Sequence, residues 1–309
     1  MSRGSCVVLG GSGFLGKSLC RRLVQEGFRV ASISRSGRPS DTYEPWHANV
    51  DWITAPLGSE KCLRVLEGCE FLFHLASSTV PSTSNANILF DLDTNVLATV
   101  RTLEAAVKHS LRRIVFVSSG GTVYGVPQRN PIDELHPTNP ICSYGVQKLT
   151  IEKYLHLFNS MADLSSVILR VSNIYGESQS PKGLVGAVAH FTHKALLGKP
   201  IEIWGDGSII RDYVHIDDVV SALMKSMTYQ GVDPLFNIGT GRGVSIKELI
   251  QMIQSRIERP IRSSYEPSRV FDVRENVLDV NRARRKLEWE ACITLEMGLD
   301  RMIGVQESD

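Results

Sequence analysis

The chain has 309 residues, a formal net charge of +1 at pH 7 and 42% hydrophobic residues, which is ordinary for a globular protein. Its balanced charge, without a dense run of lysine and arginine, argues against nucleic acid or an anionic membrane as the main partner. No apolar run approaches the roughly 20 residues that span a bilayer, and no secretory signal precedes the first motif, so we expect a cytoplasmic protein.

The six cysteines form no CxxC pair, and several lie in apolar stretches, so we expect reduced and mostly buried thiols. His190 and His193 lie three residues apart on a predicted helix, but no acidic or cysteine neighbour completes a metal site. We therefore expect no metal. The length allows one large domain or two modest ones.

The N-terminus carries an apolar run at residues 7–9, followed by Gly10, Gly13 and Gly16 at three-residue spacing and then by an amphipathic segment. This order predicts a buried strand, a tight turn and a helix. Such a turn lets the backbone and the helix N-terminus approach a dinucleotide pyrophosphate. A plain strand–helix turn without a ligand is the alternative.

A second strand is predicted at residues 29–34, and in this type of sheet its end meets the adenosine ribose. An NAD-binding protein usually has an acidic residue there, whereas this chain has Ser34, Arg35, Ser36 and then Arg38. Arginine suits a 2′-phosphate, so the segment favours NADP. A loop with solvated arginines is the alternative.

Strands and helices alternate along the first half of the chain, which predicts a parallel, doubly wound sheet. Further strands are predicted at 50–55, 71–77 and 113–119, and helices at 59–66, 91–109 and 143–159. Ligands of such sheets lie at the carboxyl ends of the strands, where Ser77, Ser118 and Ser119 are expected.

Tyr144 and Lys148 lie four residues apart at the start of the helix predicted at 143–159, so they share one face. An ammonium near a phenol lowers the pKa of the tyrosine, which then acts as a general base or acid near neutral pH. A lone Tyr-x-x-x-Lys pair is common by chance. Downstream of a nucleotide-binding motif and a serine-rich strand end, the pair indicates catalysis.

These motifs together resemble the extended short-chain dehydrogenases/reductases, which include UDP-galactose 4-epimerase and other nucleotide-sugar modifying enzymes. The resemblance covers nearly the whole length, and it includes HLA at 74–76, SSGGTVYG at 118–125, SYGVQK at 143–148, LRVSNIYG at 169–176, GDG at 205–207 and RDYVHIDD at 211–218. It implies an α/β fold, a Rossmann-type doubly wound parallel sheet with a smaller C-terminal substrate-binding domain. The first domain would span 1–172 with a return segment at about 211–240, and the second 173–210 and 241–309.

The resemblance also implies residue roles. The cofactor would contact Gly10, Gly13, Phe14, Leu15, Gly16, Ser34, Arg35, Leu75, Ala76, Ser77, Asn95 and Ser118. Tyr144 and Lys148 would be catalytic and would also contact the cofactor, Tyr144 as the catalytic base and Lys148 through the nicotinamide ribose. The nucleotide sugar would contact Asn173, Arg211, Arg269, Asp272 and Asn276. Two arginines suit a diphosphate because the guanidinium fork pairs with phosphate oxygens, although surface salt bridges would also explain them.

One departure from the family concerns Gly120, which stands where a catalytic Ser or Thr is usual. A hydroxyl is still needed to hold the sugar oxygen and relay its proton. Thr122 and Ser119 are the nearest candidates, and we favour Thr122; a water is the alternative.

Residues 121 and 122 limit which reactions of the family are possible. Family dehydratases carry an Asp-Glu pair there and decarboxylases a Glu at the second position, but this chain has Gly121 and Thr122. We expect a 4-epimerase that transiently oxidises C4 of a UDP-hexose or UDP-N-acetylhexosamine with tightly bound NAD or NADP. An NADPH-dependent reductase of a nucleotide-linked 4-keto-6-deoxy sugar is the alternative, and a catalytically inactive cofactor-binding protein is the second.

Two further expectations come from the resemblance. Asn276 would border the C2 substituent of the sugar, where a large aromatic residue excludes N-acetyl groups, so we expect N-acetylhexosamines to be tolerated. Relatives form homodimers through two helices, here those near 91–109 and 144–159, and the second offers Leu149, Tyr154, Leu155 and Leu157.

Overall fold

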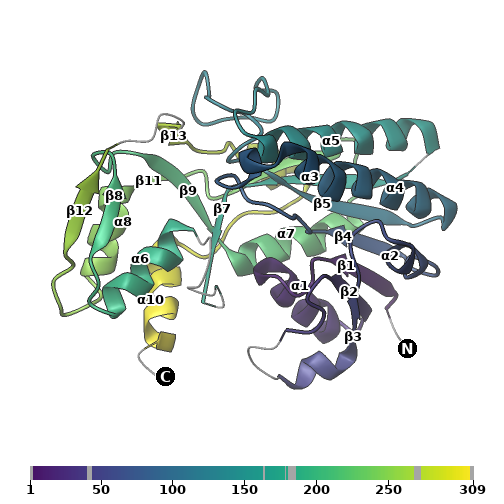
Figure 1. Cartoon of the computed structure of the whole chain (residues 1–309), viewed down its shortest axis with the longest axis horizontal. Helices are drawn as coiled ribbons and strands as arrows, with labels where there is room; N and C mark the ends of the chain where they lie inside the picture. The colour runs from purple at the N-terminus through teal and green to yellow at the C-terminus, as the bar shows by residue number, and fades with distance from the viewer. Residues whose placement is uncertain are drawn as a thin grey trace.

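The computed structural model describes residues 3–39, 44–162, 164–177, 179, 186–267 and 273–306. Figure 1 shows a larger unit, which contains the N-terminus, beside a smaller one built around α6, α8 and α10. The C-terminal helix α10 belongs to the smaller unit. No helix within the described ranges is both long and apolar enough to cross a bilayer.

The larger unit is built on a seven-stranded sheet in which every strand pair is parallel. In spatial order its strands are β10 (Leu235–Ile238), β6 (Ser166–Val171), β5 (Arg113–Ser119), β4 (Phe71–His74), β1 (Ser5–Leu9), β2 (Arg29–Ser34) and β3 (Val50–Thr54). The strand order reverses between β1 and β4. Sheets of this kind bind ligands in the crevice at that switch point. The predicted doubly wound parallel sheet is confirmed.

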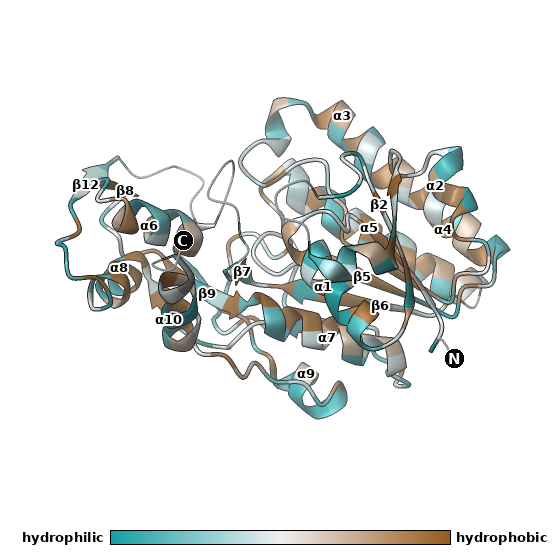
Figure 2. Ribbon diagram, turned by 90° about the horizontal axis from the view of Figure 1, so that it is seen from below, coloured by the Kyte–Doolittle hydropathy of each residue, from teal (hydrophilic) through white to brown (hydrophobic). Residues whose placement is uncertain are grey.

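Helices cover both faces of this sheet. The connections are α1 (Phe14–Gln25), η1 (Pro45–Asn49), α2 (Glu60–Arg64), η2 (Ser84–Ala86), α3 (Ile88–Asp91), η3 (Leu92–Leu97), α4 (Ala98–Lys108), α5 (Ser143–Ala162), α7 (Ile216–Thr228) and α9 (Asn281–Lys286). α1 and α7 share one hydrophobic cluster with the sheet, and α2, α4 and α5 share the other. Figure 2 shows the hydrophobic colour along β5 and β6, between these layers.

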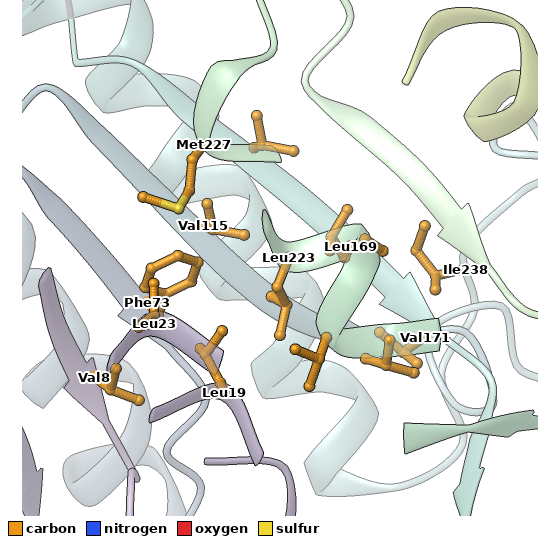
Figure 3. Packing of buried hydrophobic residues seen from close by; sticks show 14 of the residues in the cluster. Val8, Leu19, Leu23, Phe73, Val115, Leu169, Val171, Leu223, Met227 and Ile238 are labelled. Carbon is orange, nitrogen blue, oxygen red and sulfur yellow. The ribbon is translucent and has the colours of Figure 1, made fainter. Parts of the chain in front are cut away.

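Short β-branched and aromatic runs explain the core. Strands covered on both faces read as continuous apolar sequence, and β1, β4 and β6 are buried along nearly their whole length. Figure 3 shows side chains of α1 and α7, including Leu19 and Leu223, packing against Val8, Phe73 and Val115 of the strands. This core fixes the carboxyl edge of the sheet, where the site lies.

Among its described residues, the smaller unit contains two small sheets and three helices. Its strands are β7 (Asn173–Tyr175), β8 (Ile201–Trp204), β9 (Ile210–His215), β11 (Gly243–Ser245), β12 (Ser263–Glu266) and β13 (Glu275–Asn276), and its helices are α6 (Ala187–Leu196), α8 (Ile246–Gln254) and α10 (Leu295–Gln306). Of the segment expected at about 211–240, β9 pairs with β7, β11 and β13, whereas α7 and β10 join the larger unit. Ser245 caps α8, because its side chain accepts a hydrogen bond from Glu248 N at 3.1 Å.

The helix predicted at 91–109 differs in detail. It starts earlier, as α3, and passes through a π-helical stretch, η3, before it becomes α4. Single π-turns inside helices are often found at functional sites. The sequence pattern did not predict this turn because apolar spacing does not distinguish an α-turn from a π-turn.

Candidate active site

The turn between β1 and α1 is as tight as its glycines suggest. Gly10 has φ of +87°, which favours glycine, and its carbonyl accepts a hydrogen bond from Gly13 N at 3.0 Å. A Cβ on Gly16 would lie 2.2 Å from Gly10 O, so any side chain there would displace the turn. These contacts bring the N-terminus of α1 against the end of β1, where it can bind an anion.

A cavity of about 920 Å³ opens at the switch point of the sheet. It is lined by eight of the cofactor residues expected from the sequence: Gly10, Gly13, Ser34, Arg35, Leu75, Ala76, Ser77 and Asn95. It is also lined by Ser12, Phe90 and Arg101, which no sequence pattern indicated. Its size and its glycine-rich floor fit a dinucleotide.

Six of the residues expected at the cofactor do not line this cavity: Phe14, Leu15, Gly16, Ser118, Tyr144 and Lys148. Phe14 and Leu15 are half-buried and pack against the core, and Gly16 serves the packing of α1. Ser118 is buried and its hydroxyl donates to Glu152 on α5.

The end of β2 is polar and cationic. Ser34 Oγ donates to Gly37 O at 3.1 Å, and the hydroxyls of Ser12 and Ser36 lie 3.0 Å apart. Arg35 is exposed at the cavity wall. The part of the wall contributed by residues 34–36 therefore holds two hydroxyls and one guanidinium, with no carboxylate.

Lys148 lies beneath the site, on the first turns of α5. It is 5% exposed, its Nζ donates to Val117 O at 2.8 Å, and it lies 4.8 Å from the ring centroid of Phe116. Burial lowers the pKa of Lys148 to about 8, against the opposing charge of Glu152 one helical turn away. The side chain is therefore fixed and still largely protonated at neutral pH.

Tyr144 is half-buried, and Lys148 Nζ lies 5.6 Å from its ring centroid. Burial raises the pKa of Tyr144 to about 12, with smaller effects from Cys142 and Asp91. The expected lowering of this pKa is therefore wrong for the protein by itself. The physical reason is that desolvation of the phenolate dominates and that the ammonium bonds to a carbonyl, not to the phenol.

The turn after β5 brings two hydroxyls near the start of α5. A Cβ on Gly145, next to Tyr144, would lie 2.8 Å from Thr122 O, so the turn packs against the first turn of α5. The Thr122 hydroxyl is buried and has no hydrogen-bond partner among the residues described. Ser119 ends β5 and is half-buried.

Gly120 has no room for a side chain. A Cβ there would lie 2.6 Å from Leu278 Cδ1 and 3.1 Å from Arg170 O. A serine at this position would point into the protein and not into the site. In this structure the turn therefore leaves the hydroxyl role to other residues.

The expected substrate residues lie mainly on the smaller unit. Asn173 Nδ2 donates to Asp212 O at 3.0 Å, and an Arg211 nitrogen donates to Val273 O at 2.7 Å. Asn276 is 1% exposed, its Nδ2 donates to Gly120 O at 3.2 Å, and its Oδ1 has no partner in the described structure. Arg269 and Asp272 lie outside the described residues.

Two buried carboxylates behind the site were not predicted. Glu152 forms a salt bridge with Arg170 at 2.6 Å, with both side chains 5% exposed. Asp91 is fully buried and binds three neutral donors. The i, i+4 spacing of Glu152 from Lys148 was a usable signal, whereas nothing in the sequence marked Asp91.

A switch-point cavity with a glycine turn, beside a Tyr–Lys pair at the same sheet edge, defines a dinucleotide-dependent enzyme of the Rossmann type. A model of the NAD dependent epimerase/dehydratase family matches residues 6–239. This chain belongs to that family and is an enzyme of it.

Individual relatives agree over the whole length. The chain is similar to the UDP-glucose 4-epimerase of Mycolicibacterium smegmatis, with 34% identity and 96% of each chain covered. It is 31% identical to the dTDP-4-dehydro-6-deoxyglucose reductase of Escherichia coli, again with 96% of each covered. The solved UDP-N-acetylglucosamine 4-epimerase of Methanobrevibacter ruminantium superposes with a TM-score of 0.93 at 25% identity, covering 100% of this chain and 99% of that one.

Proposed function

We propose that the chain is a nucleotide-sugar 4-epimerase that transiently oxidises C4 of a UDP-hexose or UDP-N-acetylhexosamine. The observation that carries the proposal is that Tyr144 and Lys148 lie together on α5, next to the turn that bears Ser119 and Thr122, and that α5 packs against η3, which lines the dinucleotide cavity. The 4-epimerases among its relatives support it.

In this reaction Tyr144 takes the proton of the C4 hydroxyl as C4 is oxidised, and returns it when the 4-keto sugar is reduced on its other face. A nicotinamide dinucleotide, when bound, supplies the site that accepts and returns the hydride. Lys148 holds a fixed positive charge near the phenol, which favours the phenolate form of Tyr144 that accepts the proton. Thr122 or Ser119 holds the sugar oxygen and relays its proton.

The substrate diphosphate would bind Arg211 and Arg269, with Asn173 on the phosphates and Asp272 on the ribose. Arg211 and Asn173 lie on neighbouring strands, β9 and β7, which supports a shared site. The buried Asn276 amide, tied to Gly120 O, supports a pocket at C2 of the sugar. We expect Asn276→Tyr to suppress turnover of UDP-N-acetylglucosamine more than that of UDP-glucose; equal turnover of both would refute this role.

For the cofactor, Arg35 and the hydroxyls of Ser34 and Ser36 favour a 2′-phosphate, and hence NADP. Arg35→Asp should weaken NADP binding more than NAD binding, measured by calorimetry on the stripped protein. This feature also favours the second candidate function, an NADPH-dependent reductase of a 4-keto-6-deoxy nucleotide sugar, to whose class the Escherichia coli relative belongs.

The deciding experiment identifies any dinucleotide released on denaturation and then assays UDP-glucose, UDP-N-acetylglucosamine and a 4-keto-6-deoxy nucleotide sugar. Turnover with retained cofactor and no added dinucleotide supports the epimerase. Stoichiometric NADPH consumption on the keto sugar alone supports the reductase. Tyr144→Phe should lower either activity by at least about a hundredfold while the dinucleotide stays bound. Bound cofactor without any turnover would favour a catalytically inactive protein.

A homodimer is part of the proposal. Exposed apolar side chains gather on α3, η3 and α5, which pack side by side: Ile88, Leu89, Leu92, Val146, Leu157 and Met161. Exposed apolar patches of this kind mark protein interfaces. Of the side chains expected to contribute, Leu157 is exposed and Leu155 is buried in the core of its own chain.

A further inference from the structure

Asp91, the last residue of α3, is a buried carboxylate next to the proposed site. Its side chain is 0% exposed. Oδ1 accepts hydrogen bonds from the hydroxyl of Thr79 and from Asn95 Nδ2, the latter at 2.8 Å, and Oδ2 accepts one from Ser143 Oγ at 3.0 Å. No salt bridge joins Asp91 to a cation within the described residues. A buried carboxylate that is hydrogen-bonded only by neutral donors costs folding free energy. We therefore expect Asp91 to have a function.

The three donors come from three separate segments of the site. Thr79 follows β4, in the loop whose residues Leu75–Ser78 line the cofactor cavity. Asn95 lies in the π-helical η3 and lines the same cavity, and its Oδ1 accepts a hydrogen bond from Ser78 N at 2.8 Å. Ser143 is the first residue of α5. Asp91 therefore joins two walls of the cavity to the helix that carries Tyr144.

Ser143 is fixed from two further sides. Its backbone N–H donates to Asn85 Oδ1 at 2.8 Å, and Gln147 Nε2 donates to its hydroxyl oxygen at 2.9 Å. With the hydroxyl hydrogen on Asp91, the orientation of the first turn of α5 is determined. The Tyr144 hydroxyl forms no hydrogen bond with any described residue. The position of this side chain therefore depends on the orientation of that turn.

We propose that Asp91 is a positioning residue for Tyr144, which holds the first turn of α5 in register with η3 and with the loop after β4. The inference rests on the proposed function, in which Tyr144 is the acid–base group. It adds a residue that touches neither substrate nor cofactor and acts through Ser143.

The charge of Asp91 gives this role a signature. The ionisable groups that face Tyr144 are Cys142 and Lys148 from its own segment and Asp91 from α3. The negative charge of Asp91 helps to raise the pKa of Tyr144. Removing that charge should move the acidic limb of the pH–rate profile to lower pH, which a loss of packing alone would not do.

The test compares Asp91→Asn, which removes the charge, with Ser143→Ala, which cuts only the tie to α5. We expect kcat to fall about tenfold or more in both, because a small misplacement of a catalytic group is costly, with KM within about twofold of wild type. Only Asp91→Asn should shift the acidic limb. Ser160→Ala, at the exposed far end of α5, is the matched control and should leave kcat and the profile unchanged.

An unchanged kcat and profile in a folded Asp91→Asn protein would overturn the inference, and so would a lower melting temperature alone. If Asp91→Asn does not fold, a wild-type kcat in Ser143→Ala overturns it. A titration of tyrosinate absorbance, with Tyr144→Phe as the blank, separates this question from the proposed function because it needs no substrate. If the enzyme turns over no nucleotide sugar, a Tyr144 titration that Asp91→Asn leaves unchanged still refutes the inference.

Discussion

At the scale of single residues, Gly120 shows how a departure from a family motif is decided by packing. From sequence alone it could be taken as a lost hydroxyl and so as a loss of chemistry. In the structure its Cβ position is filled by Leu278, which is fully buried, and by the carbonyl of Arg170. A side chain at 120 therefore could not serve the site, and the hydroxyl has to come from Ser119 or Thr122.

We therefore expect Gly120→Ser to destabilise the fold without raising turnover. Its Cβ would overpack the core against Leu278, which costs typically about 1–3 kcal/mol. Gly121→Ser is the matched control, because the nearest atom to a Cβ there is Ser119 Oγ, at 3.9 Å. Chemical denaturation and turnover are measured for both. A Gly120→Ser enzyme with native stability and higher kcat would refute this account.

His74 is a second buried residue with a measurable effect. It is 2% exposed, and its Nε2 lies 2.8 Å from Thr99 Oγ1. The Thr99 hydroxyl donates its own hydrogen to Asn95 O, so it accepts the hydrogen bond from His74 Nε2. Burial, with a smaller effect from Lys148, lowers the pKa of His74 to about 3. The ring is thus neutral, with its proton on Nε2.

The consequence is an acid sensitivity of the free energy of unfolding. Between about pH 6.5 and pH 3 the unfolded chain binds a proton at His74 that the native state does not, so stability falls on acidification by up to about 1.4 kcal/mol per pH unit. Above pH 6.5 this residue contributes no slope. His74→Gln should flatten the dependence by about one proton, whereas the exposed His156→Gln should not, measured by urea unfolding from pH 4.5 to 7.5. Parallel slopes for all three proteins would contradict the assignment.

At the scale of elements, the β1–α1 unit separates two uses of glycine. A Cβ on Gly16 would meet backbone atoms, Gly10 O at 2.2 Å and Gly11 Cα at 2.6 Å, which cannot move aside. A Cβ on Gly13 would have only Gly10 O within reach, at 3.3 Å, but it would stand in the cavity wall. Gly16→Ala should therefore lower the melting temperature strongly. Gly13→Ala should fold and bind dinucleotide more weakly, by calorimetry. The reverse pattern would refute this division of roles.

The secondary-structure elements differ in how well the sequence predicts them. The glycine turn and the strands follow from local rules, namely apolar period and glycine spacing. The π-turn of η3 does not, and the hydrogen bonds of Asp91 and Asn95 around it reach Ser143 and Ser78, which local sequence rules do not connect to it. The pKa of Tyr144 was mispredicted for a related reason: spacing gives the nearness of Lys148, but desolvation depends on the whole surrounding fold.

At the scale of the whole molecule, one helical run joins the cofactor cavity to the outer surface. Phe90 and Asn95 line the cavity, whereas Leu89, 78% exposed, lies on the outside of α3, which packs against α5. Figure 2 shows α3 at the outer edge of the molecule. A partner bound on this face would restrain the same run that lines the cavity, so association and cofactor retention should be coupled.

This coupling gives the last prediction. We expect a dimer by light scattering at micromolar concentration, and a monomer for the double variant Leu89→Glu/Met161→Glu, because charges on an apolar interface are costly to bury. The monomer should keep the wild-type circular dichroism but release its dinucleotide faster. Leu135→Glu, equally exposed but on the segment between β5 and α5, should remain dimeric with unchanged release. If the wild-type protein is a monomer, the proposed interface is wrong. If the double variant is a monomer but releases its dinucleotide at the wild-type rate, the interface stands and the coupling is refuted.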